Sequence, residues 1–320
     1  MVRVANDDVR LRLAISYDGT DFSGWAVQPG RRTVAGVLTE ALRTLLRRES
    51  RLVVAGRTDA GVHATGQVAH VDVPVDRLMA LVPRHLKKDD ECSSPDALSG
   101  TDRDTPHSVP ATGRDSRGLP GSGVVAACRG LERRLAGLLP LDVRVRSAHP
   151  AAHGFDARFS ALSRSYAYRI GTADWGVEPA DRKFVLALRR HLDIEAMATC
   201  AAPLLGLHDF AAYCKPREGA TTIRDLQRLD VRDVGDEVIV DVTADAFCHS
   251  MVRSLVGALI AVGQHRTDPD APAALLATAR RTADIHVAPA HGLTLVAVGY
   301  PPDADLARRA EQTRALRSAR

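Results

Sequence analysis

The sequence has few cysteines, almost no lysine and no long apolar run, and each shortage excludes a class of protein. Its five cysteines are odd in number and never fall as CxxC, which argues against a disulfide framework or a thiolate zinc site. The longest apolar stretch, near 255–262, is far shorter than the roughly 20 residues of a membrane helix. The first residues lack the apolar core of a signal peptide, so we expect a cytoplasmic protein that makes no membrane contact.

Positive charge comes almost entirely from arginine, because only four of the 43 basic residues are lysines. The net charge is +4, and residues 308–320 alone carry five arginines and one glutamate. The rest of the chain is therefore neutral, and charge by itself gives no indication of nucleic-acid binding. With 320 residues, 45% of them hydrophobic and 26% charged, the chain has the composition of a soluble globular protein of about two domains.

The start of the chain follows the order strand, helix, strand, strand. Residues 10–17 alternate apolar and polar side chains, as in a half-buried strand. Thr33 can cap a helix whose apolar residues recur at helical spacing. Strands are expected at 51–55 and 66–73, with a loop between them. This order on one sheet is that of a ferredoxin-like α+β unit.

The composition changes between about 84 and 123, where Ser, Asp, Pro and Gly replace aliphatic residues. Such a segment cannot bury enough apolar surface to offset its conformational entropy, so it is predicted to be a disordered insertion. A helix near 124–138 and a strand near 141–147 follow it. We expect residues 1–147 to form an N-terminal domain that contains this insertion.

The second half predicts a similar sheet-and-helix plan. Its expected elements are a strand within 154–170, a helix near 193–205, a hairpin over 224–244, helices near 246–263 and 271–281, and a closing strand that starts at 293. We therefore expect an α+β fold with two ferredoxin-like (RRM-like) subdomains, 1–147 and 148–303, whose antiparallel sheets meet at a central active-site cleft. Residues 304–320 are expected to form an Arg-rich tail or a frayed helix.

The densest functional signal is GRTDAGVHA at 56–64, a glycine-containing loop between two expected strands. Asp59 follows Arg57 by two residues, so its carboxylate can be kept ionised by the guanidinium and act as a nucleophile or a base. The alternative is an Asx turn closed by Asp59 and trimmed by an arginine ion pair. The residues alone leave both interpretations open.

A metal site is the third interpretation of this region. His63, His70 and Asp72 could supply ligands together with the aspartate of the loop, but their spacing fits neither an HExxH helix nor a facial triad. Further along, His249 and Arg253 lie four residues apart on a mostly apolar helix, where a lone histidine is usually structural. We therefore expect no metal.

Aromatic residues cluster with arginines near the middle of the chain. Tyr166 and Tyr168 share one face of an expected strand and alternate with Arg158, Arg164 and Arg169. Aromatics interleaved with arginine on a sheet are typical of a platform for unstacked bases. The alternative is that the tyrosines fill the core between the sheet and its helices.

The run GRTDAGVHATGQVAHV at 56–71 resembles the catalytic signature of TruA-type tRNA pseudouridine synthases. Similar blocks occur in the family's order at 17–28, 133–145, 155–170, 246–263 and 291–302. The resemblance implies an isomerase that converts uridine to pseudouridine at positions 38, 39 and 40 of the tRNA anticodon stem-loop. It also implies that the enzyme needs no cofactor and is a homodimer.

The resemblance implies roles for individual residues as well. Asp59 takes the place of the catalytic nucleophile, and Arg57 matches the arginine that helps flip the target base and contacts this carboxylate. Tyr166 matches the tyrosine that stacks on the target uracil and can act as a base. Arg253 matches the basic residue that pairs with the aspartate.

The uracil pocket in this family is also lined by an apolar residue, which corresponds to Leu293 or to Leu295. Two other functions remain open beside the synthase. A non-catalytic RNA-binding protein would use the same sheet without needing Asp59. A metal-dependent hydrolase would use His63, His70 and Asp72.

Overall fold

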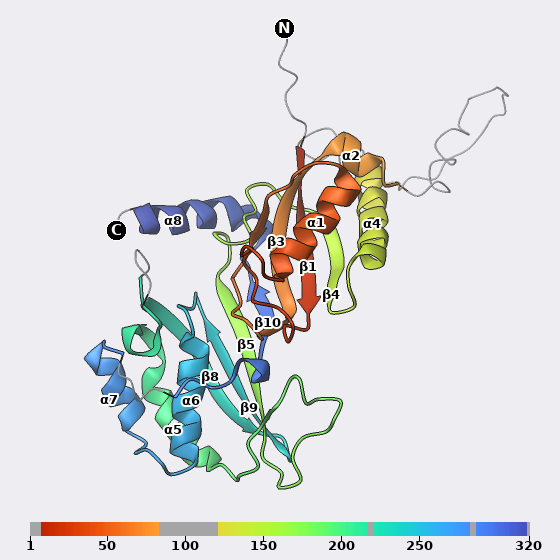
Figure 1. The fold of residues 1–320 in the computed structure, drawn as a ribbon. Coiled ribbons are helices and arrows are strands. Elements are labelled where there is room, and N and C mark those ends of the chain that lie inside the picture. The colour runs from red at the N-terminus through yellow and green to blue at the C-terminus, as the bar shows by residue number, and fades with distance from the viewer. Residues whose placement is uncertain (1–7, 83–120, 217–220, 282–285, 319–320) are drawn as a thin grey trace, which may run out of the picture.

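The computed structural model describes residues 8–82, 121–216, 221–281 and 286–318. The predicted insertion at about 84–123 lies outside the described residues except for its last three. The described part is a mixed α+β structure built on one large, mostly antiparallel sheet of ten strands (Figure 1).

This sheet runs through both halves of the molecule in the order β4-β1-β3-β10-β5-β9-β8-β7, with β2 paired to β3 and β6 paired to β5. The strands are β1 Asp8–Tyr17, β2 Leu52–Val54, β3 His63–Pro74, β4 Val143–Pro150, β5 Ser163–Gly171, β6 Leu186–Ala187, β7 Gly206–Asp209, β8 Ile223–Asp233, β9 Glu237–Ala244 and β10 Leu293–Gly299. Pairing is antiparallel except between β3 and β10 and between β5 and β6. The antiparallel sheets that were expected to meet are therefore continuous with each other in one sheet, and the ferredoxin-like character of each half stays a prediction.

The two halves join where β3 meets β10. The contact consists of two residue pairs, Thr294 with His63 and Leu295 with Ala64. Gly66 allows the close approach, because a Cβ at this position would lie 1.9 Å from the carbonyl oxygen of Val296. The pattern of each half predicts its own strands, but it carries no signal for a pairing between strands about 230 residues apart.

Helices cover one face of the sheet in each half. The helices are α1 Val34–Leu46, α2 Val75–Met79, α4 Gly121–Leu138, α5 Ile194–Ala201, α6 Met251–Gly263, α7 Ala271–Thr278 and α8 Leu306–Ser318, and short 3-10 turns are η1 Ala202–Leu204, η2 Ala211–Tyr213, η3 Ala290–Gly292 and η4 Asp303–Asp305. Figure 1 shows α1 and α4 against the first half of the sheet and α5 and α6 against the second. Within the described segments, no helix combines the length and the apolar character that a bilayer crossing requires.

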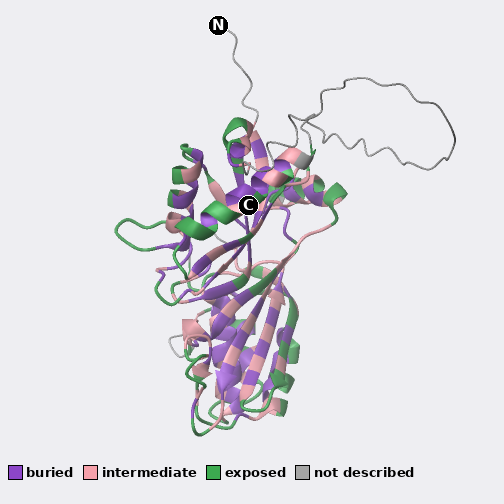
Figure 2. Ribbon diagram, turned by 90° about the vertical axis from the view of Figure 1, so that its right-hand side faces the viewer, coloured by how far each residue is buried: buried purple, intermediate pink, exposed green. Residues whose placement is uncertain are grey.

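The main core lies between the sheet and these helices. Leu11, Leu13 and Ile15 on β1 are fully buried, and Leu38 and Leu42 of α1 are 0% and 1% exposed. The predicted strand near the N-terminus is confirmed, as is the helix after it, whose N-cap side chain accepts a hydrogen bond from the third residue on. Figure 2 shows buried and half-buried residues alternating along the strands, which is the pattern of a sheet covered on one face.

The C-terminal segment, expected to be a tail or a frayed helix, is a helix that docks on the rest of the chain. In α8, Leu306 and Ala310 are each 1% exposed, and Leu306 packs in a small second core with Phe155. Nη2 of Arg314 lies 2.9 Å from Oδ2 of Asp156. Among the residues of α8 whose burial is described, 306–315, the two deeply buried ones are Leu306 and Ala310, and the rest of this stretch is mostly polar.

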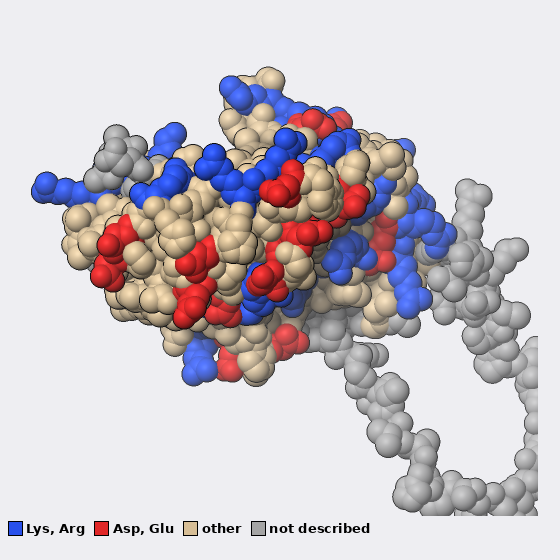
Figure 3. All heavy atoms as spheres, turned by 90° about the horizontal axis from the view of Figure 1, so that it is seen from below, with Lys and Arg blue, Asp and Glu red and all other residues tan. Residues whose placement is uncertain are grey.

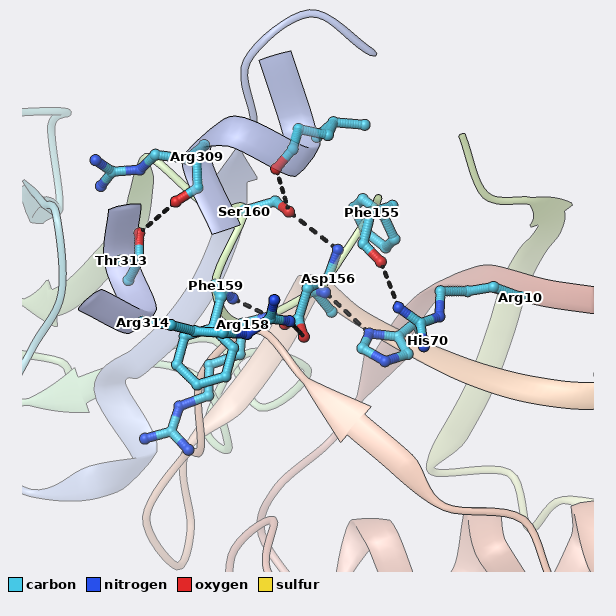
Figure 4. A network of polar contacts seen from close by, with 12 residues as sticks. Arg10, His70, Phe155, Asp156, Arg158, Phe159, Ser160, Arg309, Thr313 and Arg314 are labelled. Atoms are coloured by element: carbon cyan, nitrogen blue, oxygen red, sulfur yellow. Dashed lines mark hydrogen bonds and ion pairs between the residues drawn. The ribbon is translucent and has the colours of Figure 1, made fainter. Parts of the chain in front are cut away.

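A polar network joins α8 and the loop after β4 to the back of β3 (Figure 4). Nδ1 of His70 accepts a hydrogen bond of 2.9 Å from the Ala157 backbone. Oδ1 of Asp156 accepts from the backbone N–H groups of Arg158 and Phe159 at 2.8 and 2.9 Å. Burial lowers the pKa of His70 to about 4, so its imidazole is neutral in the folded protein at pH 7.

Two cysteines are joined in the structure. Cys214 and Cys248 form a disulfide with a Cα–Cα distance of 5.7 Å, whereas Cys128 and Cys200 are buried free thiols. A single pair is not the disulfide framework that the cysteine count argued against, but the sequence did not predict this pair. The two residues are 34 positions apart, and only tertiary packing of the segment after η2 against the loop before α6 brings them together.

Candidate active site

Asp59 lies in the loop between β2 and β3, beside the junction of the two halves. The segment after β1 supports this loop, because the Trp25 N–H donates to the Thr58 carbonyl oxygen at 3.0 Å. The hydroxyls of Tyr17 and Thr58 are 2.8 Å apart. Gly24 has a φ of +91° and allows close packing, since a Cβ there would lie 2.9 Å from that same carbonyl oxygen. Two sequence blocks that each resemble the family thus form one structural unit.

The partner of Asp59 is His249, from the loop between β9 and α6. Nε2 of His249 lies 3.4 Å from Oδ1 of Asp59, and the two side chains are 44% and 32% exposed. The turn at Asp59 is closed by its backbone, because the Val62 N–H donates to the Asp59 carbonyl oxygen at 3.2 Å. In the part of the chain that the structure describes, the carboxylate accepts no backbone hydrogen bond, so the Asx-turn alternative is wrong.

The two arginines expected beside Asp59 lie elsewhere. Nε of Arg253 donates to the Ala288 carbonyl oxygen at 2.6 Å, and no ion pair within 4.0 Å joins Arg253 to Asp59. Arg57 is exposed, and across the described ranges its guanidinium forms no hydrogen bond or ion pair. The expected Arg253–Asp59 pair is therefore corrected: the arginine is bound to the carbonyl oxygen of Ala288, just before η3, and His249 lies near the carboxylate.

Tyr166 and Tyr168 lie on the helix-covered face of β5. Tyr166 is 7% exposed, and its ring meets that of Phe247 edge to face at 5.3 Å between centroids. Tyr168 is fully buried and donates to the Pro289 carbonyl oxygen at 2.8 Å. Both tyrosines therefore lie in the core between the sheet and its helices, Tyr168 completely and Tyr166 except for a small exposed part. Burial raises the pKa of Tyr166, and the negative charge of Asp59 raises it further, so its hydroxyl stays protonated at neutral pH.

The register of β10 on β5 distinguishes the two candidate leucines. Leu295 lies directly opposite Tyr166, and Leu293 lies opposite Tyr168. Both leucines are buried, at 0% and 4% exposure. Directly opposed side chains of an antiparallel pair are close neighbours on one face. The register therefore places Leu295 beside Tyr166 and Leu293 beside Tyr168, and the assignment of either leucine to the uracil pocket stays a prediction.

Arg164, which the sequence analysis named only among the arginines of a possible base-binding platform, supports the site from within the fold. It is 7% exposed, and its guanidinium donates to the carbonyl oxygens of Ala55, Asp245 and Arg158 at 2.7, 2.7 and 2.9 Å. Ala55 precedes the loop of Asp59, and Asp245 precedes the loop that carries the histidine partner. The sequence feature that could have pointed to this role is the position of Arg164 two residues before Tyr166 on the same strand.

His63, His70 and Asp72, the candidate metal ligands, each contact a different partner. Nδ1 of His63 accepts from the Gly19 N–H at 2.9 Å, and Nε2 donates to the His291 carbonyl oxygen at 3.1 Å. His70 belongs to the network behind β3, and Asp72 forms a two-pronged ion pair with an arginine of β1. Among the described residues, no three His, Cys, Asp or Glu side chains lie close enough together to hold a metal ion.

Basic side chains gather on the face of the molecule seen from below. Figure 3 shows Lys and Arg in a band across the upper part of this face, with most of the Asp and Glu beneath it. A band of basic side chains of this kind attracts the phosphates of nucleic acid. The neutral balance of the chain outside 308–320 therefore conceals an uneven distribution of charge.

Comparison with known proteins identifies the family. The chain is 51% identical over 313 residues to tRNA pseudouridine synthase A of Mycobacterium leprae (strain TN), covering 98% of this chain and 97% of that protein. The chain belongs to the tRNA pseudouridine synthase A family. The protein of this name from Frankia casuarinae is 51% identical over 311 residues, which cover 97% of this chain and 96% of that protein. Pseudouridine synthases are isomerases.

The family model described as tRNA pseudouridine synthase matches residues 200–301, which include His249, Arg253 and Leu295. Asp59 and Tyr166 lie outside this match and inside the longer alignments to the synthases. A slighter likeness, with a TM-score of 0.27 and 10% identity, relates 78% of the chain to 54% of a chain in a crystal structure of a Cbf5-Nop10-Gar1 complex.

Proposed function

We propose that the chain converts uridine to pseudouridine at positions 38, 39 and 40 of the tRNA anticodon stem-loop. The observation that carries this proposal is the Asp59 carboxylate, which is 32% exposed at the junction where both halves of a synthase-family chain contribute side chains. His249 and Tyr166 come from the second half of the chain, and Asp59 comes from the first.

The reaction needs a carboxylate and a flipped base, and it needs no redox group. The N1–C1′ bond of the nucleotide breaks, the C5–C1′ bond forms, the hydrogen at C5 leaves to solvent, and N1 gains a proton. Asp59 acts as the nucleophile that holds the intermediate between these two bonds. No electron is transferred and no water is consumed, so the chain works without a cofactor.

The uridine must leave its stack, which costs a few kcal/mol. Arg57 is exposed in the same loop as Asp59 and occupies the space of the extracted base. Tyr166 and Leu295 form the apolar side of the pocket, and Arg253 contributes positive charge from α6. Because the pKa of Tyr166 is raised, its hydroxyl acts as a neutral hydrogen-bond partner and not as the base.

The enzyme acts as a cytoplasmic homodimer that holds one tRNA between its subunits. The cytoplasm is where a tRNA substrate is available, and family resemblance supports the dimer. Analytical ultracentrifugation tests this arrangement: a monomer that keeps full activity would contradict it.

Tritium release tests the function. Three tRNAs labelled at C5 of uridine, each with uridine at only one of positions 38, 39 and 40, should all release tritium. Enzyme treated with EDTA and desalted should react at the same rate. If none of the three tRNAs released tritium, the proposed function would be contradicted. Release from only one or two of them would limit the modified positions to the uridines of those tRNAs.

A further inference from the structure

We propose that Tyr17 and Gln67 are positioning residues for Asp59, because a buried chain of hydrogen bonds through their side chains fixes the loop that carries the carboxylate. This inference rests on the proposed function and deepens it, since it assigns the residues behind the site that set the place of the nucleophile. Tyr17 is the last residue of β1 and Gln67 lies on β3, and Figure 1 shows these paired strands side by side.

The chain of hydrogen bonds joins two points of the loop to these strands. Nε2 of Gln67 donates to the Gly56 carbonyl oxygen at 2.9 Å and to the Tyr17 hydroxyl at 3.3 Å. The Tyr17 hydroxyl is 2.8 Å from Oγ1 of Thr58. Gly56 and Thr58 are two residues apart, and Thr58 directly precedes Asp59. The segment before the carboxylate is therefore attached at both ends.

The three side chains of this chain are buried, so water does not readily replace a contact that is lost. Gln67, Tyr17 and Thr58 are 0%, 5% and 6% exposed. The amide oxygen of Gln67 accepts from the Val68 N–H at 3.2 Å, so both ends of the amide have partners. Burial raises the pKa of Tyr17 to about 12, so at neutral pH its hydroxyl can both accept and donate a hydrogen bond. A buried polar network with its partners in place favours one conformation of the loop.

Thr58 is held from two sides, and this fixes the backbone just before Asp59. Its side chain contacts Tyr17, and its carbonyl oxygen accepts from the Trp25 N–H at 3.0 Å. The Asp59 carboxylate is 32% exposed and, within the described ranges, accepts no hydrogen bond from the backbone. Its position therefore depends on the backbone that carries it.

The chain of hydrogen bonds also lies next to the proposed uracil pocket. Burial raises the pKa of Tyr166, and the nearness of Tyr17 and of Asp59 raises it further. These three residues are thus close enough to influence one another electrostatically. Tyr17 therefore lies beside the proposed chemistry and not in a remote part of the core.

The test removes one hydroxyl at a time. Tyr17→Phe keeps the ring and deletes the link to Thr58, and a reacting group misplaced by about 1 Å loses on the order of 10²-fold in rate. We expect the single-turnover rate of tritium release to fall by about 10- to 100-fold, with the tRNA dissociation constant nearly unchanged. Thr58→Val should be similarly slow, whereas Thr58→Ser keeps the hydroxyl and should recover most of the rate.

The chain offers a matched control in another buried tyrosine. Tyr213 is 0% exposed, and its hydroxyl donates to the Pro272 carbonyl oxygen at 2.7 Å. Tyr213→Phe should lower the midpoint of urea unfolding about as much as Tyr17→Phe does, because each loses a buried hydrogen bond, but it should keep the wild-type rate.

Three results would overturn the positioning role. The first is a Tyr17→Phe enzyme with the wild-type rate. The second is a Thr58→Ser enzyme as slow as Thr58→Val. The third is a Tyr213→Phe enzyme as slow as Tyr17→Phe, because the rate would then follow stability alone.

Hydrogen exchange of the free protein gives a readout that does not depend on activity. The Val62 N–H donates to the Asp59 carbonyl oxygen at 3.2 Å, and its exchange reports opening of the loop. Tyr17→Phe should make this amide exchange faster, and Tyr213→Phe should not. Unchanged exchange in Tyr17→Phe would overturn the positioning role even if the enzyme is a synthase. Faster exchange, together with a wild-type protein that releases no tritium, would reject the proposed function and keep the role of Tyr17 in holding the loop.

Discussion

Arg164 and Ala55 are joined across the two halves by a hydrogen bond of 2.7 Å, in which Nη2 of the arginine donates to the carbonyl oxygen. Nη1 of the same guanidinium donates to the Asp245 carbonyl oxygen, also at 2.7 Å. These carbonyls stand at the start of the two loops that carry Asp59 and His249. One buried side chain therefore ties both loops to β5.

Replacing Arg164 with Met should damage both stability and turnover. The substitution leaves buried carbonyl oxygens without their donor, and each buried unsatisfied group costs about 1–3 kcal/mol. We expect the free energy of unfolding, measured in urea, to fall by about 2–4 kcal/mol, together with a lower single-turnover rate. Arg228→Met, at an arginine 50% exposed on β8, is the control and should change little. A stable and fully active Arg164→Met enzyme would show that the loops of Asp59 and His249 keep their positions without this side chain.

The stability of the protein should fall in mild acid because of His70. Burial lowers the pKa of His70 to about 4, against about 6.5 for histidine in an unfolded chain. Below pH 6.5 the unfolded chain therefore binds a proton that the folded protein does not, and stability is lost as the pH falls from 6.5 towards 4. The pKa of Asp156 is held below its usual range despite burial, by backbone N–H groups, His70 and Arg314, so its contribution is lost in the same direction at lower pH.

Urea unfolding at pH 7.5, 6 and 5 measures this effect. His70→Gln keeps a side-chain acceptor for the Ala157 N–H but removes the titration, so its stability should depend less steeply on pH than that of the wild type. Equal slopes for the two proteins would assign the acid sensitivity to other groups, such as His63, whose pKa is also lowered by burial.

The docking of α8 should depend on its buried contacts and not on its exposed charges. Leu306→Ala removes a side chain that is 1% exposed, and such truncations cost about 2–5 kcal/mol. Arg308→Ala removes an exposed ion pair with Asp305 and should change the free energy of unfolding by less than about 0.5 kcal/mol. Thermal unfolding of both variants checks this difference. A mild Leu306→Ala and a severe Arg308→Ala would contradict the docked helix.

Local elements of the fold could be predicted from the sequence, whereas contacts between distant elements could not. The alternation over 10–17 and the cap at Thr33 depend on neighbouring residues, and both are confirmed. The β3–β10 pairing and the disulfide between Cys214 and Cys248 depend on tertiary packing, which leaves no local pattern.

The candidate site shows the same division. The loop of Asp59 is identified by its motif, and its position between two strands is confirmed. The family resemblance implied that its partner is Arg253. A motif gives residue types in order but not the direction of each side chain, so the contact with His249 could not be predicted from it. His249 was interpreted as a structural residue on a helix, but α6 begins two residues later, at Met251, so the histidine lies in a loop that can reach the other half.

The most direct test of the account is tritium release by Asp59→Asn under single-turnover conditions, with the tRNA dissociation constant measured on the same sample. The amide keeps the size of the side chain but cannot act as the nucleophile. We expect the Asp59→Asn enzyme to react more slowly by roughly 10³-fold or more, with tRNA bound within a few-fold of wild-type affinity. An Asp59→Asn enzyme that releases tritium at the wild-type rate would contradict the assignment of Asp59 as the catalytic carboxylate.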